Sequence, residues 1–417
     1  MAISEIMSTF APIMNIPFSP PYIDNSVVEE VTDSLRSGWI TTGPKVKALE
    51  EEIMKLAGSE AVLCVNSWTT GAIMALRWLG VKADDEVIIP AYTYCATALA
   101  VIWAGAKPVM VDAGEDFNIS VEAIRRAITP RTKAILPVDI AGWPCDYKAI
   151  MQLVQEPDIV KKFQPSSDVQ KQLGRIIVIN DSAHSIGSHY GSNFSGTQTD
   201  IAIFSLHAVK NITTAEGGAI CLNMPEPFDN KQLYQQLRLM SLNCQTKDAF
   251  TKSKAGGWRY DIVGMGMKAN MADVNAAIGL AQIRKYPQML VRRKEIFQAY
   301  NEAFAQEPWA ILPPMNDGSR ETSYHIYPLR IRDFSEEQRD AMIAEISKSQ
   351  VAVNVHFIPL PMLTLFSQLG YKMEDYPQAY ANYAHEITLP CYPMLTDEQV
   401  AFVIKTVKEA YSCVAKS

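Results

Sequence analysis

Short apolar runs and helical patterns alternate along the middle of the chain. Between residues 61 and 220, runs rich in Val and Ile are separated by stretches in which apolar residues recur every three or four positions. This alternation is typical of βαβ units, whose strands form a largely parallel sheet covered by helices on both faces. The candidate strands are AVLCV at 61–65, EVIIP at 86–90, KPVMVD at 107–112, KAILPV at 133–138, RIIVIND at 175–181, DIAIFSL at 200–206 and GAICLN at 218–223. The pattern predicts an α/β fold with a mostly parallel seven-stranded sheet, and ligands of such sheets bind beyond the carboxyl ends of the strands.

Two segments around this block have patterns of their own. Residues 44–57 form a candidate amphipathic helix that ends at Gly58, with its apolar residues at helical spacing. Residues 151–174 contain two prolines and many polar residues, which predicts a helix extended by a surface excursion. Neither segment carries a candidate chemical role.

From about residue 281 the pattern becomes that of a smaller α/β domain. Two helices are expected to begin after Ser335 and Thr396, because each of these residues is followed three positions later by Gln, as in a capping box. The last helix should bury Val400, Val403, Ile404 and Val407, and the segment VAVNVHF at 351–357 reads as a strand.

These patterns divide the chain into two domains. We expect a large domain over residues 15–280 and a small C-terminal domain over residues 281–417, with residues 1–14 packing on the small domain.

Composition narrows the possible functions. The chain has 417 residues, 48% hydrophobic and 20% charged, which is ordinary for a globular protein. A net charge of -7 without a basic stripe argues against a nucleic-acid binder. Seven scattered cysteines suggest reduced core residues and a cytoplasmic protein. No signal sequence or apolar run long enough for a membrane span is visible, so no membrane partner is expected.

The first candidate chemical residue is Lys210, in SLHAVKNITTAEGG, just beyond the strand predicted at 200–206. Desolvation at such a position lowers the pKa of a lysine and makes its amine a nucleophile toward a carbonyl group. The alternative is a solvated loop lysine, and this motif alone does not decide between them.

Asp181 and His184 follow another predicted strand, in VINDSAH. A carboxylate at a strand end can keep a pyridine nitrogen protonated, as the chemistry of pyridoxal 5'-phosphate (PLP) requires. The alternative for Asp181 is an ordinary helix N-cap.

Two further strand ends carry suitable groups. In LCVNSWTTG, the hydroxyls near Ser67 stand at the start of a predicted helix, which favours phosphate binding, although simple capping explains them too. In IIPAYTYCAT, Tyr92 or Tyr94 could lie against a planar ring or belong to the core.

Two other enzyme classes fit poorly. The six histidines show neither an HExxH motif nor a CxxC pair nearby, so no metal site is expected. GMGMKAN, at 264–270, lacks the third glycine of a dinucleotide-binding loop.

Taken together, these motifs resemble those of the PLP-dependent nucleotide-sugar aminotransferases of the DegT/DnrJ/EryC1/StrS family, which have the fold-type I architecture. The resemblance covers nearly the whole chain, from SGWITTGPKVKALEEEI at 37–53 through IPAYTYCATALAVIWAGAKPVMVD, DSAHSIGSHYG, DIAIFSLHAVKNITTAEGGAI and NMADVNAAIGLAQI to LPCYPMLTDEQV at 389–400. It implies that the larger domain binds PLP.

The resemblance also implies roles for individual residues. Lys210 forms the Schiff base with PLP, Asp181 pairs with the pyridine nitrogen, and Tyr94 stacks on the ring. His184 lies near the phenolic oxygen of the cofactor. The residues expected around the phosphate are Ser67, Trp68 and Ser205. Trp68 departs from the family, which usually has a small residue there, and its indole N–H either donates to the phosphate or only packs.

One matching residue implies a homodimer. Asn270 corresponds to a residue that reaches the phosphate of the cofactor in the neighbouring subunit, so the resemblance predicts shared active sites.

The implied reaction is a transamination in two halves. L-glutamate gives its amino group to the cofactor and leaves as 2-oxoglutarate, and a nucleotide-linked keto-sugar then takes up the amine. Since some family members that have histidine in place of the lysine are dehydratases, the presence of Lys210 favours transamination. His207 and the TTAEGG run resemble members that aminate C4, which favours a 4-keto-6-deoxy sugar. Products of this kind commonly enter surface polysaccharides or glycans.

Four residues are expected at the substrate by the same resemblance. Thr41, Thr42 and His325 would face the sugar nucleotide, and His356 would reach its phosphates. Both histidines could instead be neutral core residues with backbone partners. The nucleotide is left open among UDP, dTDP and GDP. The alternative functions are a C3-specific aminotransferase of the same family and a PLP-binding sensor without turnover.

Overall fold

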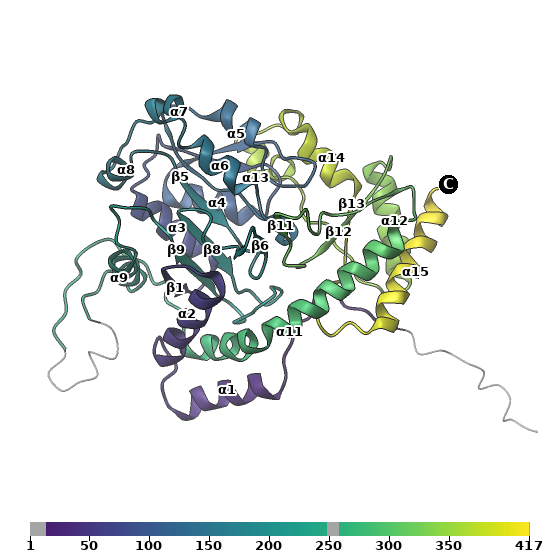
Figure 1. Cartoon of the computed structure of the whole chain (residues 1–417), viewed down its shortest axis with the longest axis horizontal. Coiled ribbons are helices and arrows are strands. Elements are labelled where there is room, and N and C mark those ends of the chain that lie inside the picture. Colours follow the sequence, from purple (N-terminus) through teal and green to yellow (C-terminus); the bar gives the residue numbers. More distant parts are fainter. Residues whose placement is uncertain (1–13, 248–257, 417) are drawn as a thin grey trace, which may run out of the picture.

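A seven-stranded sheet forms the centre of the protein, whose computed structural model describes residues 14–247 and 258–416 (Figure 1). The strands lie in the order β1-β9-β8-β5-β4-β2-β3. All run parallel except β9, which is antiparallel to both of its neighbours. Their bounds are β1 (Ala61–Val65), β2 (Glu86–Pro90), β3 (Lys107–Val111), β4 (Thr132–Ile135), β5 (Ile177–Asp181), β8 (Ile201–Ser205) and β9 (Gly218–Leu222). The prediction of a mostly parallel seven-stranded sheet is confirmed.

Both faces of this sheet are buried. The side chains of successive strand residues point to opposite faces, and both sets of side chains belong to buried cores. In β8, Ile203 belongs to a core beneath one set of helices, whereas Phe204 belongs to a core on the other side. The first set comprises α3 (Trp68–Leu79), α4 (Cys95–Ala104) and α9 (Asn230–Ser241). The opposite face is covered by α2 (Pro44–Ala57), α5 (Val121–Ala127), α6 (Tyr147–Leu153) and the first part of α11 (Asp273–Phe304). This layering leaves the carboxyl edge of the sheet for ligands.

Helix α2 matches the element expected over 44–57. Pro44 stands at its first position, where a missing N–H costs nothing, and Gly58 closes it with a φ of 71°. Helix α1 (Asn25–Arg36) packs along α11, as Figure 1 shows below the sheet.

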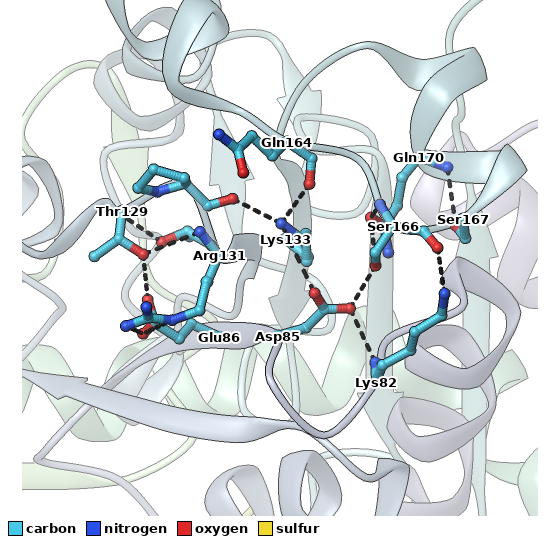
Figure 2. A network of polar contacts seen from close by, with 12 residues as sticks. Lys82, Asp85, Glu86, Thr129, Arg131, Lys133, Gln164, Ser166, Ser167 and Gln170 are labelled. Carbon is cyan, nitrogen blue, oxygen red and sulfur yellow. Dashed lines mark hydrogen bonds and ion pairs between the residues drawn. The ribbon is translucent and has the colours of Figure 1, made fainter.

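The excursion at 151–174 folds as the end of α6 followed by α7 (Pro157–Lys162) and α8 (Asp168–Leu173). Figure 2 shows how a polar network fastens it to the amino ends of β2 and β4. The buried amine of Lys133 donates to the carbonyls of Pro130, at 2.7 Å, and Gln164, at 2.5 Å. Asp85 accepts from the Ser166 hydroxyl at 2.7 Å. The segment therefore stabilises the edge of the sheet opposite the candidate site.

A second, smaller sheet lies at the far end of α11 (Figure 1). It consists of β10 (Ala310–Ile311), β12 (Tyr327–Ile331) and β13 (Glu386–Leu389). Its core also includes residues of α12 (Glu336–Lys348) and α15 (Asp397–Val414). Both expected capping boxes are present, at Ser335 and Thr396. In α15, Val400, Val403 and Val407 are buried and Ile404 is half-buried against the same core.

The remaining elements connect these two bodies. A short three-stranded sheet joins β6 (His189–Tyr190) and β7 (Asn193–Phe194) to β11 (Arg320–Glu321). Two further helices are α13 (Thr364–Gln368) and α14 (Pro377–His385). Three short 3-10 turns lie at Ile140–Gly142, Leu360–Met362 and Met373–Asp375.

One predicted strand is wrong. Residues 351–357 form only two isolated bridges, Val351 with Ile16 and Asn354 with Thr388. Since these partners belong to different parts of the chain, the apolar alternation of this segment does not extend into a ladder.

The domain boundary stays a prediction. Helix α11 contributes Ala276 and Leu280 to the core of the large sheet and Ile296 and Phe297 to that of the small sheet. Residues 1–13 lie outside the described residues, and Met14 packs against the small core.

Candidate active site

The carboxyl ends of several strands of the large sheet converge on one cavity of about 340 Å3. Asp181 ends β5 and Ser205 ends β8, while the segments after β1 and β2 also reach the cavity. Nine of the predicted residues line it: Ser67, Trp68, Tyr94, Asp181, His184, Ser205, Lys210, His325 and His356. Residues at the carboxyl edge of the large sheet therefore meet His325, which lies just before β12, and His356 at this point.

Lys210 and Asp181 form the electrostatic centre of the cavity. Lys210 follows β8 in a turn, and its main-chain N–H donates to the carbonyl of His207 at 3.0 Å. Burial lowers the pKa of its amine to about 8, against the opposing effect of the Asp181 charge. At pH 7 roughly a tenth of the amine is then neutral, far more than for an ordinary lysine, and the neutral form is what a nucleophile or general base requires.

Asp181 is 4% exposed, and two groups hold its carboxylate. The Thr97 hydroxyl donates to Oδ2 at 2.9 Å, and the main-chain N–H of Ala183 donates to Oδ1 at 3.2 Å. Burial raises the pKa of Asp181 to about 7, although both hydrogen bonds and the charge of Lys210 act in the other direction. A cation placed against this carboxylate would favour its ionised form. The N-cap alternative for Asp181 does not apply, because no helix of the described residues begins there.

The start of helix α3 lies on another wall of the cavity. Ser67 is its N-cap, and its Oγ accepts from the main-chain N–H of Thr70 at 3.1 Å, so the capping role is real. The turn packs closely against β9, because a Cβ at Gly218 would lie 2.7 Å from Trp68 N. Trp68 is buried, and its Nε1 has no hydrogen-bond partner in the described residues.

Two histidines lie against each other beside this centre. The ring centroids of His184 and His325 are 4.4 Å apart. Nδ1 of His325 is 2.9 Å from Oδ1 of Asn211, whereas Nδ1 of His184 is buried without a partner among the described residues. Burial lowers the pKa of both rings well below the usual value, so both are neutral.

The two candidate tyrosines have different places. Tyr92 is fully buried, and its hydroxyl donates to the carbonyl of His356 at 2.5 Å, as a core residue. Tyr94 lines the cavity, is 60% exposed and tilts against Phe357. Stacking of Tyr94 on a cofactor stays a prediction.

Three predicted residues do not line this cavity. Thr42 and Asn270 line a second cavity, of about 660 Å3, where the Asn270 amide donates to Thr42 Oγ1 at 2.6 Å. Thr41 accepts from the main-chain N–H of Asp273 at 3.3 Å. Within one chain, these residues are separate from Lys210.

Sequence reasoning missed three supporting residues: Thr97, Glu386 and Thr388. Thr97 stands one helical turn after Thr93, and the hydroxyls of the two are 3.0 Å apart. Glu386 and Thr388 lie two positions apart on one face of β13. Glu386 accepts from the main-chain N–H of His356, and Thr388 Oγ1 lies within hydrogen-bond distance of Nδ1 of its ring. The one sequence signal for these residues is the spacing of polar pairs within apolar runs, four positions for Thr93 and Thr97 and two positions for Glu386 and Thr388.

The donor set fits PLP. An acid for the ring nitrogen, an amine for the aldehyde and a helix N-terminus for the phosphate face one cavity. The unpartnered Trp68 Nε1 and His184 Nδ1 belong to the same walls. Of the described residues, no group of His, Cys, Asp and Glu could hold a metal ion. In that same part of the chain, no helix is both long and apolar enough to cross a membrane.

Comparisons with known proteins agree with this arrangement. Residues 21–408 match the model of the DegT/DnrJ/EryC1/StrS aminotransferase family. The chain is 37% identical to protein MJ1066 of Methanocaldococcus jannaschii over 95% of this chain and 98% of that protein. It is 34% identical to the spore coat polysaccharide biosynthesis protein SpsC of Bacillus subtilis, over 94% of this chain and 96% of that one.

A solved structure is similar over almost the full length. It is the PMP form of the "Putative sugar aminotransferase Spr1654" from Streptococcus pneumoniae, with 43% identity and a TM-score of 0.92, covering 96% of this chain and all of the other. The same protein has also been solved in its PLP form. Helicobacter pylori PseC, an aminotransferase of pseudoaminic acid biosynthesis, is 26% identical with a TM-score of 0.84 over 96% of this chain and 100% of its own.

Proposed function

The chain belongs to the DegT/DnrJ/EryC1/StrS aminotransferase family, and from that premise we propose that it moves an amino group from L-glutamate to C4 of a nucleotide-linked 4-keto-6-deoxy sugar. The general activity of a PLP-dependent sugar aminotransferase follows from the family and its solved relatives. The observation that carries the proposal is the meeting of the Lys210 amine and the Asp181 carboxylate in one cavity.

PLP, when bound, supplies an electrophilic aldehyde and a ring that withdraws electrons from the substrate carbon. The Asp181 carboxylate would accept a hydrogen bond from the ring nitrogen and favour its protonated form. Lys210 would take the proton from the α-carbon of glutamate and deliver it to the cofactor carbon in the same half of the reaction. In the second half it would move a proton the opposite way, from the cofactor carbon to the sugar carbon, which its lowered pKa permits. His184 and Tyr94 would orient the ring, while the N-terminus of α3, with Ser67, Trp68 and Ser205, would hold the phosphate.

Two of the proposed substrate residues, both of the predicted small domain, line this cavity. His325 and His356 line the cavity beside Lys210 and are the contacts proposed for the sugar nucleotide. The position of SpsC in polysaccharide biosynthesis supports a polysaccharide or glycan as the destination of the product.

We further propose a homodimer in which Asn270, Thr41 and Thr42 complete the site of the partner. Their separation from Lys210 within one chain supports this arrangement. Mixing Lys210→Ala and Asn270→Ala subunits tests it, because a hybrid dimer then has one intact site. Recovery of about a quarter of the wild-type activity is expected after random mixing. Failure to recover activity would rule out shared sites.

A cytoplasmic location is also proposed. No disulfide joins any of the cysteines in the described residues, which agrees with a reducing compartment.

The substrate is tested with a panel of nucleotide-linked keto-sugars, varying the nucleotide and the keto position, with L-glutamate present. Mass spectrometry should detect an amino sugar and 2-oxoglutarate only with 4-keto-6-deoxy substrates. Product from 3-keto sugars would favour the C3-specific alternative. PLP binding without 2-oxoglutarate release on any substrate would favour a sensor.

A further inference from the structure

The ring of His356 is held firmly at the cavity wall. Nδ1 lies 3.0 Å from Oγ1 of Thr388, and the ring of Phe18 stacks on it with centroids 5.5 Å apart at 21°. The main-chain N–H of His356 donates to Oε2 of Glu386 at 2.9 Å. No side chain of the described ranges bonds to Nε2, so this nitrogen is the ring atom left for a ligand.

Thr388 links His356 to Glu386. Its Oγ1 is within hydrogen-bond distance of both Oε1 of Glu386 and Nδ1 of His356. A hydroxyl has one hydrogen, so Thr388 can donate to only one of these two partners and must accept from the other. The protonation of Glu386 therefore decides which ring nitrogen of His356 carries the hydrogen.

The surroundings of Glu386 decide its protonation. It is fully buried on β13, and the charged groups that face it are Arg339 of α12 and Arg330 of β12, with the Tyr92 hydroxyl nearby. Burial raises the pKa of Glu386 to about 8, although the hydrogen bonds from Thr388 and from the main-chain N–H of His356, and then the two arginines, act in the other direction.

The titratable groups facing His356 are those of the cavity. Lys210 opposes its protonation, and His184 and His325 interact with it across the cavity. Burial lowers the pKa of His356 to about 3, so the ring stays neutral. Near neutral pH the hydrogen of Glu386 points to Thr388, the hydroxyl donates to Nδ1, and the ring hydrogen is on Nε2.

We propose that Glu386 and Thr388 are positioning residues that make Nε2–H of His356 a donor to an anionic oxygen of a substrate. Two sources have this chemistry, the diphosphate of the nucleotide-linked sugar and a carboxylate of glutamate. The inference rests on the proposed function, because it takes substrate binding at His356 as its premise.

Raising the pH reverses the chain of donors. The Glu386 hydrogen passes to Thr388, the Thr388 hydrogen passes to Nδ1, and the Nε2 hydrogen leaves to solvent, so one proton is lost in total. Nε2 then presents a lone pair to the anionic oxygen, and binding weakens.

The test measures binding to the PLP-loaded enzyme between pH 6.5 and 9. Calorimetry gives the affinities of UDP, dTDP and GDP, and the concentration dependence of the spectral change to the PMP form gives that of L-glutamate. The variants are Glu386→Gln, whose amide imitates the protonated acid, Thr388→Val, which removes the hydroxyl, and Thr388→Ser, which keeps it. Thr406→Val, a buried threonine of α15, is the matched control.

In the wild type, one of the two ligand classes should bind about tenfold more weakly at pH 9 than at pH 7. Glu386→Gln should remove this pH dependence. Thr388→Val should bind the affected ligand weakly at every pH. Thr388→Ser and Thr406→Val should behave as the wild type. The class affected identifies the anionic oxygen.

Two results would overturn the inference: an unchanged pH dependence in Glu386→Gln, or wild-type affinity in Thr388→Val at pH 7. If Glu386→Gln does not fold, as judged by PLP content and melting temperature, the Val and Ser variants decide at pH 7. His356→Ala distinguishes failure of the positioning role of Glu386 and Thr388 from failure of the substrate contact proposed for His356. If it changes neither affinity, the proposed substrate role of His356 itself fails.

Discussion

The Thr97 hydroxyl donates to Oδ2 of Asp181 across 2.9 Å, joining the first turn of α4 to the end of β5. This bond lowers the pKa of Asp181, against the effect of burial. Thr97→Val should therefore favour the neutral acid and weaken PLP binding by about five- to tenfold, equivalent to roughly 1 kcal/mol. Titration of the apoprotein with PLP measures this change. Thr406→Val should bind PLP as wild type, and equal affinities in all three proteins would contradict the role given to this bond.

Lys210→Ala should abolish transamination and the absorbance of the lysine-bound cofactor without loss of fold. The pKa of the Lys210 amine falls from 10.5 in the unfolded chain to about 8 in the folded protein, so at pH values below 8 the buried charge destabilises the fold. Removing the amine removes this destabilisation. The melting temperature of the apo variant at pH 7 should be no lower than that of the wild type. A markedly lower value would show that the amine is needed for packing.

Asp181 should make the stability of the apoprotein depend on pH. Its pKa rises from 3.8 in the unfolded chain to about 7, so the folded state binds more protons between these values and loses stability as pH rises through them. Asp181→Asn lacks this loss. Its advantage over the wild type in urea unfolding should be larger at pH 8 than at pH 5 by about 3 kcal/mol. An advantage that does not grow with pH would contradict the assignment.

Gly218→Ala should damage the phosphate end of the site. The added Cβ would lie 2.7 Å from both Ser67 C and Trp68 N, and backbone atoms cannot move aside as a flexible side chain can. PLP affinity should fall about tenfold. Gly71→Ala is the control, because its Cβ would meet only side-chain carbons, at 3.2 to 3.4 Å. It should lose stability but bind PLP normally once folded, and the reverse ranking would refute the prediction.

Asp139 should be needed for stability behind Asp181. Its carboxylate is fully buried and accepts from Cys145 N at 2.9 Å, Tyr147 at 2.5 Å, Asn180 at 2.8 Å and Ser185 at 2.6 Å. Asp139→Ala leaves these donors unsatisfied and should cost roughly 3–5 kcal/mol in urea unfolding. Tyr147→Phe removes one donor and should cost only about 1 kcal/mol. Similar losses for both would mean that the carboxylate is not the organising group.

The sequence by itself determined the large sheet and the order of chemical groups along it. All seven strand segments are apolar runs between helical patterns, and the two capping boxes have an unambiguous three-residue spacing. Because parallel strands share a carboxyl edge, the residues after them had to approach one another, which placed Asp181 and Lys210 in one site.

Tertiary structure alone decided the support and division of that site. Thr97 is recognisable only once the first turn of α4 meets the end of β5, and the link from Glu386 to His356 joins residues 30 positions apart. The separation of Thr42 and Asn270 from Lys210 also depends on the fold. The failed strand at 351–357 has the same cause. Local patterns specify which face of an element is buried, whereas the partner that satisfies each polar group depends on contacts between distant segments.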